Sequence, residues 1–270
     1  MGVLEVSLAD HIATVCLNRP SSRNALNSEL VVSLASTWQQ LRDDSQVRVV
    51  VLTGAGESTF CSGFDLGTFI PLMTGVRAPQ DEWDQRLVDA GLMALTGRAT
   101  LRDFDLAKPL VLAANGHAIA AGMELLLASD IRVVAEGARL GLSEVRIGLI
   151  PAMGGTARLA RQIPPALAAE FLLTGNPITA ERALAAGLVN QVAPAAKVLD
   201  VAMEYAKSIA ANAPLAVSAA REVALRSRDL SEPEALELEG EKSKELARTE
   251  DAIEGPRAFM EKRPPVFKGR

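Results

Sequence analysis

Hydrophobic and polar positions along the chain predict a mixture of strands and helices. Apolar residues run or alternate over 3–8 and 12–17 on either side of Ala-Asp-His, which predicts a β-hairpin. Asn27-Ser28 precedes apolar residues at three- and four-residue spacing, which predicts a helix. A valine-rich run at 46–53 predicts a strand buried on both faces. Further strands are predicted at 110–114, 131–135 and 188–192.

The pattern changes at residue 197. Before it, strand, turn and helix units recur, including a helix from about Ala121, which predicts an α/β core joined by right-handed crossovers. After it, helical patterns dominate as far as residue 258, with breaks expected near Pro214, Ser231–Pro233 and Gly255-Pro256. We therefore expect a core at 1–196 that carries the active site and a helical region at 197–270. This region packs either on another subunit or on its own core.

Composition limits the classes of partner. The chain has 270 residues, 49% of them hydrophobic, which is ample for a buried core. Its net charge of −5 provides no basic field for nucleic acid. Polar residues interrupt the most apolar stretch, 109–131, so no membrane span is expected, and the start of the chain does not resemble a targeting segment. Two cysteines without metal-ligand spacing are typical of a reducing compartment, so we expect a cytoplasmic protein.

Two glutamates carry the strongest chemical signal. Glu124 and Glu144 lie 20 residues apart, each just past a glycine-containing turn at a predicted helix start. Two carboxylates in one cleft can divide the acid and base halves of a proton transfer when their environments separate their pKa values. This arrangement favours the addition or removal of water. The alternative is that each glutamate only complements the positive end of a helix dipole.

Other kinds of site find little support. The two histidines, His11 and His117, are too few for a multi-histidine metal site, and a structural role for His117 at a strand end is favoured over catalysis. Gly54 and Gly56 imitate the start of a dinucleotide-binding loop, but Thr59 occupies the third glycine position and no helix follows. We therefore expect neither a metal nor a redox cofactor.

Six segments, in order and over nearly the whole chain, resemble the crotonase superfamily, the enoyl-CoA hydratase/isomerase family. They are LNRPSSRNALN, STFCSGFDL, ANGHAIAAGMELLLASD, LGLSEVRIGLIPAMGGTARLAR, LTGNPITAERALAAGLVNQV and FMEKRPPVFKG. The resemblance implies a spiral of ββα units with a C-terminal trimerisation region, forming a homotrimer or a dimer of trimers. It also implies an acyl-CoA thioester as substrate, with coenzyme A as part of that substrate.

The resemblance assigns catalytic roles by motif position. The backbone amides of Phe64 and Ala121 would stabilise an enolate oxygen. Glu124 would deprotonate the attacking water, and Glu144 would donate a proton to the α-carbon. The family usually has glycine where Ala121 stands, a smaller residue at Phe64 and a small residue at Met153, so the acyl pocket is expected to differ in shape.

The resemblance also assigns residues that bind the substrate. A loop with backbone groups near Ala25 and Leu26 and the cation Arg23 would hold coenzyme A, while Lys262 and Lys268 would reach the nucleotide of a neighbouring subunit. For these cations the alternative is solvated surface charge. Apolar residues at 66–100 would line the acyl tunnel or belong to the core. The remaining expected contacts are Phe60, Ser62, Gly63, Asp65, Leu66, Gly122, Pro151 and Gly154.

The sequence therefore predicts an enoyl-CoA hydratase. An enoyl-CoA isomerase or a specialised 3-hydroxyacyl-CoA dehydratase can use the same two acids. An alternative of another class is a noncatalytic scaffold or an RNA-binding homologue, against which the intact acid pair and the negative charge argue.

Overall fold

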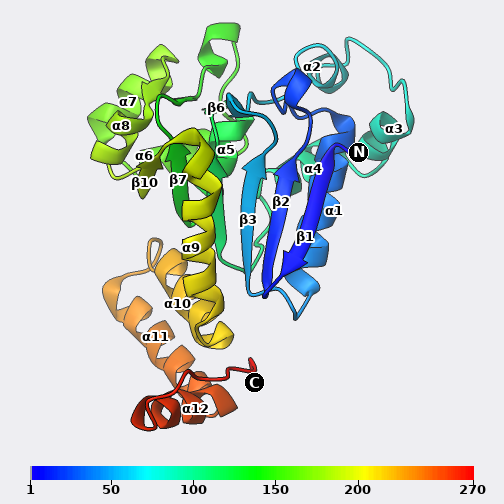
Figure 1. The fold of residues 1–270 in the computed structure, drawn as a ribbon. Helices are drawn as coiled ribbons and strands as arrows, with labels where there is room; N and C mark the ends of the chain where they lie inside the picture. The colour runs from blue at the N-terminus through cyan, green and yellow to red at the C-terminus, as the bar shows by residue number, and fades with distance from the viewer. Residues whose placement is uncertain (1) are drawn as a thin grey trace.

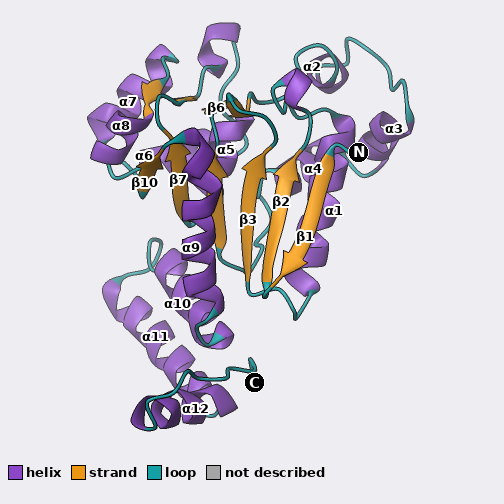
Figure 2. Ribbon diagram, viewed as in Figure 1, coloured by secondary structure: helices purple, strands orange, loops and turns teal. Residues whose placement is uncertain are grey.

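The computed structural model describes residues 2–270, which build a large sheet, a small sheet and a set of surrounding helices (Figures 1 and 2). The large sheet has the strand order β1-β2-β3-β5-β7-β10. β1 and β2 pair antiparallel as the predicted hairpin, and the other neighbours pair parallel. The strands are β1 (Leu4–Ala9), β2 (Ile12–Leu17), β3 (Val49–Gly54), β5 (Leu110–Ala114), β7 (Ile131–Ala135) and β10 (Gln191–Ala193).

Burial across the large sheet follows the residue types of its strands. Every residue of β3 and of β5 is buried, as expected for continuous apolar runs in a parallel sheet. β1 forms an edge and is mostly exposed. The centre of the core therefore lies along β3, β5 and β7.

The small sheet has the order β4-β6-β8-β9. Its strands are β4 (Thr59–Cys61), β6 (His117–Ile119), β8 (Arg139–Gly141) and β9 (Ile178–Thr179). β4, β6 and β8 pair parallel, whereas β8 and β9 pair antiparallel. Each of β4, β6 and β8 follows a strand of the large sheet, so the chain repeats one pattern three times: a long strand, a short strand and then a helical segment.

Helices pack around these sheets. α1 begins after Asn27, whose side chain accepts a hydrogen bond from the Leu30 amide, and its Trp38 Nε1 donates to the Ala99 carbonyl oxygen. The helices of the core are α1 (Ser28–Asp43), α2 (Phe69–Met73), α3 (Glu82–Asp89), α4 (Leu92–Ala99), α5 (Ala121–Ala128), α6 (Gly155–Ala160), α7 (Pro165–Thr174) and α8 (Ala180–Ala185).

Four more helices form the C-terminal region. α9 (Val198–Ala210) packs on the large sheet against β3, β5 and β7. The three that follow extend away from the sheets, toward the bottom of Figure 1: α10 (Pro214–Arg226), α11 (Glu232–Leu246) and α12 (Glu250–Met260). The helical region thus begins on the core with α9, and Arg221 of α10 still pairs with Asp105 and Asp130 of the core. In the part of the chain that the structure describes, no helix has the length and apolar character needed to span a membrane.

The breaks predicted near Pro214 and Ser231–Pro233 are confirmed, but the break at Gly255-Pro256 is wrong. α12 continues through Pro256, although proline removes a backbone donor from the helix. The C-terminal tail holds this helix: Asp251 accepts hydrogen bonds from the Lys268 and Gly269 amides, and Glu254 forms an ion pair with Arg263. Two strand boundaries also differ, since β3 starts at Val49 rather than residue 46 and β10 lies at Gln191–Ala193 rather than 188–192.

Candidate active site

The ends of β4, β6 and β8 bring the predicted catalytic residues together. Cys61 pairs with Ala118, and Ile119 pairs with Gly141, so the three strands end at one edge of the small sheet. Because the strands are parallel, the segments that follow them emerge side by side. Phe64 follows β4, Ala121 and Glu124 follow β6, and Glu144 follows β8. Residues separated by up to 80 positions in the sequence therefore share one site.

Two backbone amides beside these strand ends are unpaired donors. Within residues 2–270, neither the Phe64 amide nor the Ala121 amide donates a hydrogen bond. Ala121 is the first residue of α5, where an amide has no partner inside the helix and the dipole favours negative charge. The Ala121 side chain is fully buried, so the helix start accommodates the methyl group that replaces the usual glycine.

Close backbone packing holds these two amides near each other. Gly63 has φ +99°, and a Cβ atom there would lie 2.6 Å from Ala120 Cβ and 3.4 Å from the Ala121 nitrogen. A Cβ atom on Gly122 would lie 2.4 Å from the Cys61 carbonyl oxygen. Only glycine allows both approaches, so α5 lies directly against the end of β4.

Glu124 is a buried carboxylate held by two amides. It is 1% exposed, and its Oε1 accepts hydrogen bonds from the Met153 amide at 2.7 Å and the Gly155 amide at 3.0 Å. Burial, together with the charge of Glu144, raises the pKa of Glu124 to about 7, against the opposing effects of the two amides and Arg158. The carboxyl group is thus poised to gain or lose a proton near neutral pH.

Glu144 is the first residue of a short 3-10 helix, Glu144–Ile147. Its side chain is half-buried, and among residues 2–270 its Oε2 is buried without a hydrogen-bond partner. Burial raises the pKa of Glu144 above its usual range. Its negative charge also acts on Glu124, so ionisation of Glu144 favours the protonated form of Glu124.

The predicted coenzyme A loop is held by its own hydrogen bonds. The Ala25 amide donates to the Ser22 carbonyl oxygen at 3.0 Å, and the Leu26 amide donates to the Gly63 carbonyl oxygen at 2.8 Å. These two residues can therefore offer a ligand only carbonyl lone pairs, not amides. Arg23 is exposed, with φ 53°, and forms no ion pair within residues 2–270.

Sequence reasoning missed the residues that shape this loop. Asn24 is fully buried, accepts from the Arg19 amide and donates to the carbonyl oxygens of Ala55, Thr59 and Phe60. Arg19 forms an ion pair with Asp65 at 3.3 Å. No local pattern predicts the role of Asn24, because the carbonyl groups that it binds lie more than thirty positions away in the sequence.

The other predicted contacts divide into exposed and buried positions. Leu66 is 65% exposed, Ser62 and Asp65 are half-buried, and the Phe60 side chain is fully buried in the core. Gly63 and Gly122 contribute by allowing the close contact between α5 and the end of β4 described above. Pro151 is buried beside Glu124, and Gly154 precedes α6 with φ 101°.

Lys262 and Lys268 lie away from this site in their own chain. They follow α12, at the opposite end of the molecule from α5 (Figure 1). Both are exposed, and Lys268 pairs with Glu250 at 3.3 Å. Any role at a nucleotide therefore requires a second subunit.

An aromatic pair stands beside the Phe64 amide. The rings of Phe64 and Phe69 stack with their centroids 4.7 Å apart and their planes 13° apart. Phe69 is fully buried and begins α2, within the stretch where the acyl tunnel was predicted. Phe64 thus provides a candidate hydrogen-bond donor through its backbone amide, and its ring forms an apolar surface beside that amide.

Within residues 2–270, no three side chains of His, Cys, Asp or Glu are grouped so that they could hold a metal ion. His117 accepts a hydrogen bond from the Arg139 amide through Nδ1, which supports the structural role predicted for it. The groups that converge here are therefore two carboxyls and two amides.

The chain is similar to a known protein family and to several known proteins. The family model for Enoyl-CoA hydratase/isomerase matches residues 8–270. The (E)-benzylidenesuccinyl-CoA hydratase of Thauera aromatica is 37% identical over 266 residues, which covers 98% of each chain. An enoyl-CoA hydratase of Mycobacterium tuberculosis is 39% identical over 260 residues, covering 96% of this chain and 94% of its own.

A solved structure confirms the predicted fold of ββα units with a helical C-terminal region. The crystal structure of an enoyl-CoA hydratase from Bacillus anthracis matches with a TM-score of 0.88 and 35% sequence identity. The match covers 99% of this chain and 100% of that chain. The C-terminal helices are thus part of the shared architecture.

The raised pKa of Glu124 predicts a pH-dependent stability difference. The folded chain binds more protons than the unfolded chain between the ordinary pKa of 4.5 and the folded value of about 7, so stability is lost as pH rises through this window. Glu124→Gln removes this titration. Between about pH 4 and pH 8, the unfolding free energy of the wild type should fall by about 3 kcal/mol relative to Glu124→Gln, measured by urea denaturation. Parallel pH curves for the two proteins would contradict the assignment.

Proposed function

Since the chain belongs to the enoyl-CoA hydratase/isomerase family, we propose that it is a hydratase that reversibly adds water to a 2-enoyl-CoA thioester to give a 3-hydroxyacyl-CoA. The observation that carries the proposal is the meeting of Glu124 and Glu144 with two unpaired amides at the ends of β4, β6 and β8. Water addition requires these groups: a base, an acid and a site for developing negative charge.

The amides of Phe64 and Ala121 stabilise the thioester oxygen. As water attacks the β-carbon, electrons move through the conjugated system and negative charge develops on this oxygen. Two fixed donors lower the energy of the resulting enolate without reorganising, because the backbone already holds them in place. The dipole of α5 adds to their effect.

The two acids divide the proton transfer. Glu124, whose carboxylate is stabilised by the Met153 and Gly155 amides, takes a proton from the attacking water. Glu144, whose Oε2 has no hydrogen-bond partner within residues 2–270, donates a proton to the α-carbon. The pair begins with one proton and ends with one proton, so dehydration runs through the same groups in reverse. No redox step occurs in this reaction.

The preference for particular acyl groups follows from the aromatic pair beside the Phe64 amide. The stacked rings of Phe64 and Phe69 favour an apolar, flat or extended acyl group over a strongly polar one. The relatives named above differ in their acyl groups, so a panel of substrates is needed. Rates with crotonyl, longer, branched and aromatic 2-enoyl-CoA esters would define the preference, and turnover of a 3-enoyl-CoA in place of these would favour an isomerase.

Replacement of either acid tests the proposed chemistry. Glu124→Gln and Glu144→Gln keep side-chain shape but remove proton transfer, so each should lower kcat by about 10²- to 10⁴-fold while KM changes little. Steady-state hydration kinetics measure this effect. Far-ultraviolet circular dichroism checks the fold, and Glu136→Gln, on an exposed turn, serves as the matched control. Hydration at wild-type rates in both variants would remove the pair from the mechanism.

The backbone donor of Ala121 can be tested with proline. Ala121→Pro deletes the amide hydrogen at the first position of a helix, where proline is tolerated, and loss of one such donor costs about 10²- to 10³-fold in rate. Coenzyme A binding should weaken less than turnover. Ala121→Gly, which keeps the amide, is the control and should retain activity. A folded proline variant with full activity would show that this amide is not a donor.

We also propose that the enzyme works as a homotrimer or a dimer of trimers built by the C-terminal region. Apolar side chains on and after α12 are strongly exposed, with Phe259 83%, Met260 81% and Ile253 70% exposed. Such a cluster is typical of a surface covered by another subunit. In this assembly Lys262 and Lys268 reach a neighbour's nucleotide.

Sedimentation equilibrium tests the assembly. The wild type should show a mass of at least about three times 28.6 kDa. The double change of Phe259 and Met260 to Asp should shift the mass toward 28.6 kDa, because it places charge in the apolar contact. Val76→Asp changes an equally exposed apolar residue outside the C-terminal region and should leave the mass unchanged. A monomeric wild type at assay concentration would defeat the proposal.

A further inference from the structure

The direction of the Phe64 amide is set by a bridge with Leu26. The two residues form a parallel bridge, in which the Leu26 amide donates to the Gly63 carbonyl oxygen at 2.8 Å and the Asp65 amide donates to the Leu26 carbonyl oxygen at 3.0 Å. In a parallel pair, the residue between the two bonded positions turns its own amide and carbonyl groups away from the partner. The Phe64 amide therefore points away from the loop that contains Leu26.

The side chain of Arg19 links the two segments that form this bridge. Its guanidinium donates to the Ala25 carbonyl oxygen and binds Asp65 Oδ2 at 3.3 Å. Ala25 precedes Leu26 and Asp65 follows Phe64, so the link lies directly beside the bridge. The side chains of Arg19 and Asp65 are only 17% and 18% exposed, so water competes little for their contact.

Asp65 uses both of its carboxylate oxygens for contacts within the chain. Oδ2 binds Arg19, and Oδ1 accepts hydrogen bonds from the Gly67 and Thr68 amides, each at 3.1 Å. Its carbonyl oxygen accepts from the Phe69 amide at 2.9 Å, at the start of α2 and of the stacked aromatic pair. Asp65 therefore organises the main chain on both sides of the ion pair.

We propose that Arg19 and Asp65 are positioning residues for the Phe64 donor. Neither side chain donates to the thioester oxygen. Together they hold the Leu26 bridge, and the bridge directs the amide toward the developing charge. Such a donor must be aligned closely, because hydrogen bonds weaken steeply as they bend. The inference rests on the oxyanion role proposed above for Phe64.

Two variants break the ion pair and change the local charge in opposite senses. Asp65→Asn keeps a side-chain oxygen that can accept from the Gly67 and Thr68 amides, but it removes a negative charge and places an amide donor against the guanidinium. Arg19→Gln removes a positive charge and the bond to Ala25. A through-space effect of charge would move the stability of an enolate in opposite directions in the two variants. Loss of position lowers it in both.

Acetoacetyl-CoA is the probe, because its enolate places negative charge on the thioester oxygen and absorbs in the near ultraviolet. At one fixed pH and saturating ligand, the ratio of enolate to neutral ligand reports the strength of the two donors, however tightly coenzyme A is held. Asp65→Asn and Arg19→Gln should each lower this ratio by about tenfold, which is less than the loss of about 10²- to 10³-fold for a whole donor. The double variant should lose no more than either single variant, because all three break the same contact.

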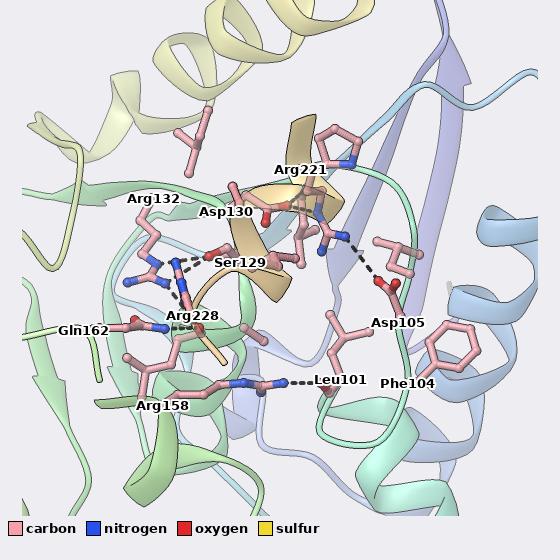
Figure 3. A pocket seen from close by; sticks show the side chains of 18 of the residues that line it. Leu101, Phe104, Asp105, Ser129, Asp130, Arg132, Arg158, Gln162, Arg221 and Arg228 are labelled. Carbon is pink, nitrogen blue, oxygen red and sulfur yellow. Dashed lines mark hydrogen bonds and ion pairs between the residues drawn. The ribbon is translucent and has the colours of Figure 1, made fainter. Parts of the chain in front are cut away.

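A second arginine–aspartate pair provides the matched control. Arg221 binds Asp130 at 2.8 Å with 16% and 22% of their side chains exposed, and Asp130 Oδ2 also accepts from the Leu110 amide at 2.8 Å. The pair lines a cavity of about 910 Å³ between the core and α10 (Figure 3). It lies before β5 and β7, at the ends of these strands that face away from the active site. Asp130→Asn and Arg221→Gln break a similarly buried pair and should leave the enolate ratio unchanged.

Circular dichroism checks the fold of every variant, and Arg19→Lys, which keeps the charge beside Asp65, should retain more enolate than Arg19→Gln. A wild type that forms no enolate would overturn the proposed oxyanion site and this inference with it. If the wild type forms the enolate, three results would overturn the inference alone. They are wild-type ratios in both single variants, shifts in opposite directions, and an equal loss in the control pair.

Discussion

The parallel pairing of three short strands is the constraint on which the site depends. β4, β6 and β8 contain three residues each, yet their order fixes where three helical segments begin. Cys61 pairs with Ala118 after a register shift between Thr59 and Cys61, and Ile119 pairs with Gly141 in a regular ladder. In the regular β6–β8 pair, a slip by one residue would turn every side chain to the other face. Gly63 and Gly122 lack the Cβ atoms that would clash with Ala120 and Cys61, so α5 can lie against the end of β4.

Electrostatics adds a second constraint to this geometry. A carboxylate as buried as Glu124 loses its hydration, and the two amides that hold it return only part of that energy. Since Met153 and Gly155 flank the start of α6, the position of the carboxyl depends on a helix from a different repeat. Arg158, from the same helix, also acts on Glu124, because its positive charge lowers the pKa of that carboxyl group.

Local patterns predicted much of this molecule from its sequence. The hairpin, the cap at Asn27 and the bounds of β5 and β7 follow from periodicity and turn chemistry within a few residues. The two glutamates were found because motif spacing fixes them. Asn24 and Arg158 were missed, since their partners lie far away in the chain and no local pattern records them. The break predicted at Pro256 was wrong for the same reason. Contacts from the C-terminal tail hold α12 together where local preference predicts a break.

In the proposed mechanism, Phe64 serves the site through two independent parts. Its amide belongs to the main chain and is present whichever amino acid, other than proline, stands there. Its ring stacks on Phe69 and shapes the neighbouring wall. Selection can therefore alter the residue at this position, and with it the substrates that fit, without losing the donor. An enzyme built in this way can diversify across metabolism while its chemistry is inherited intact.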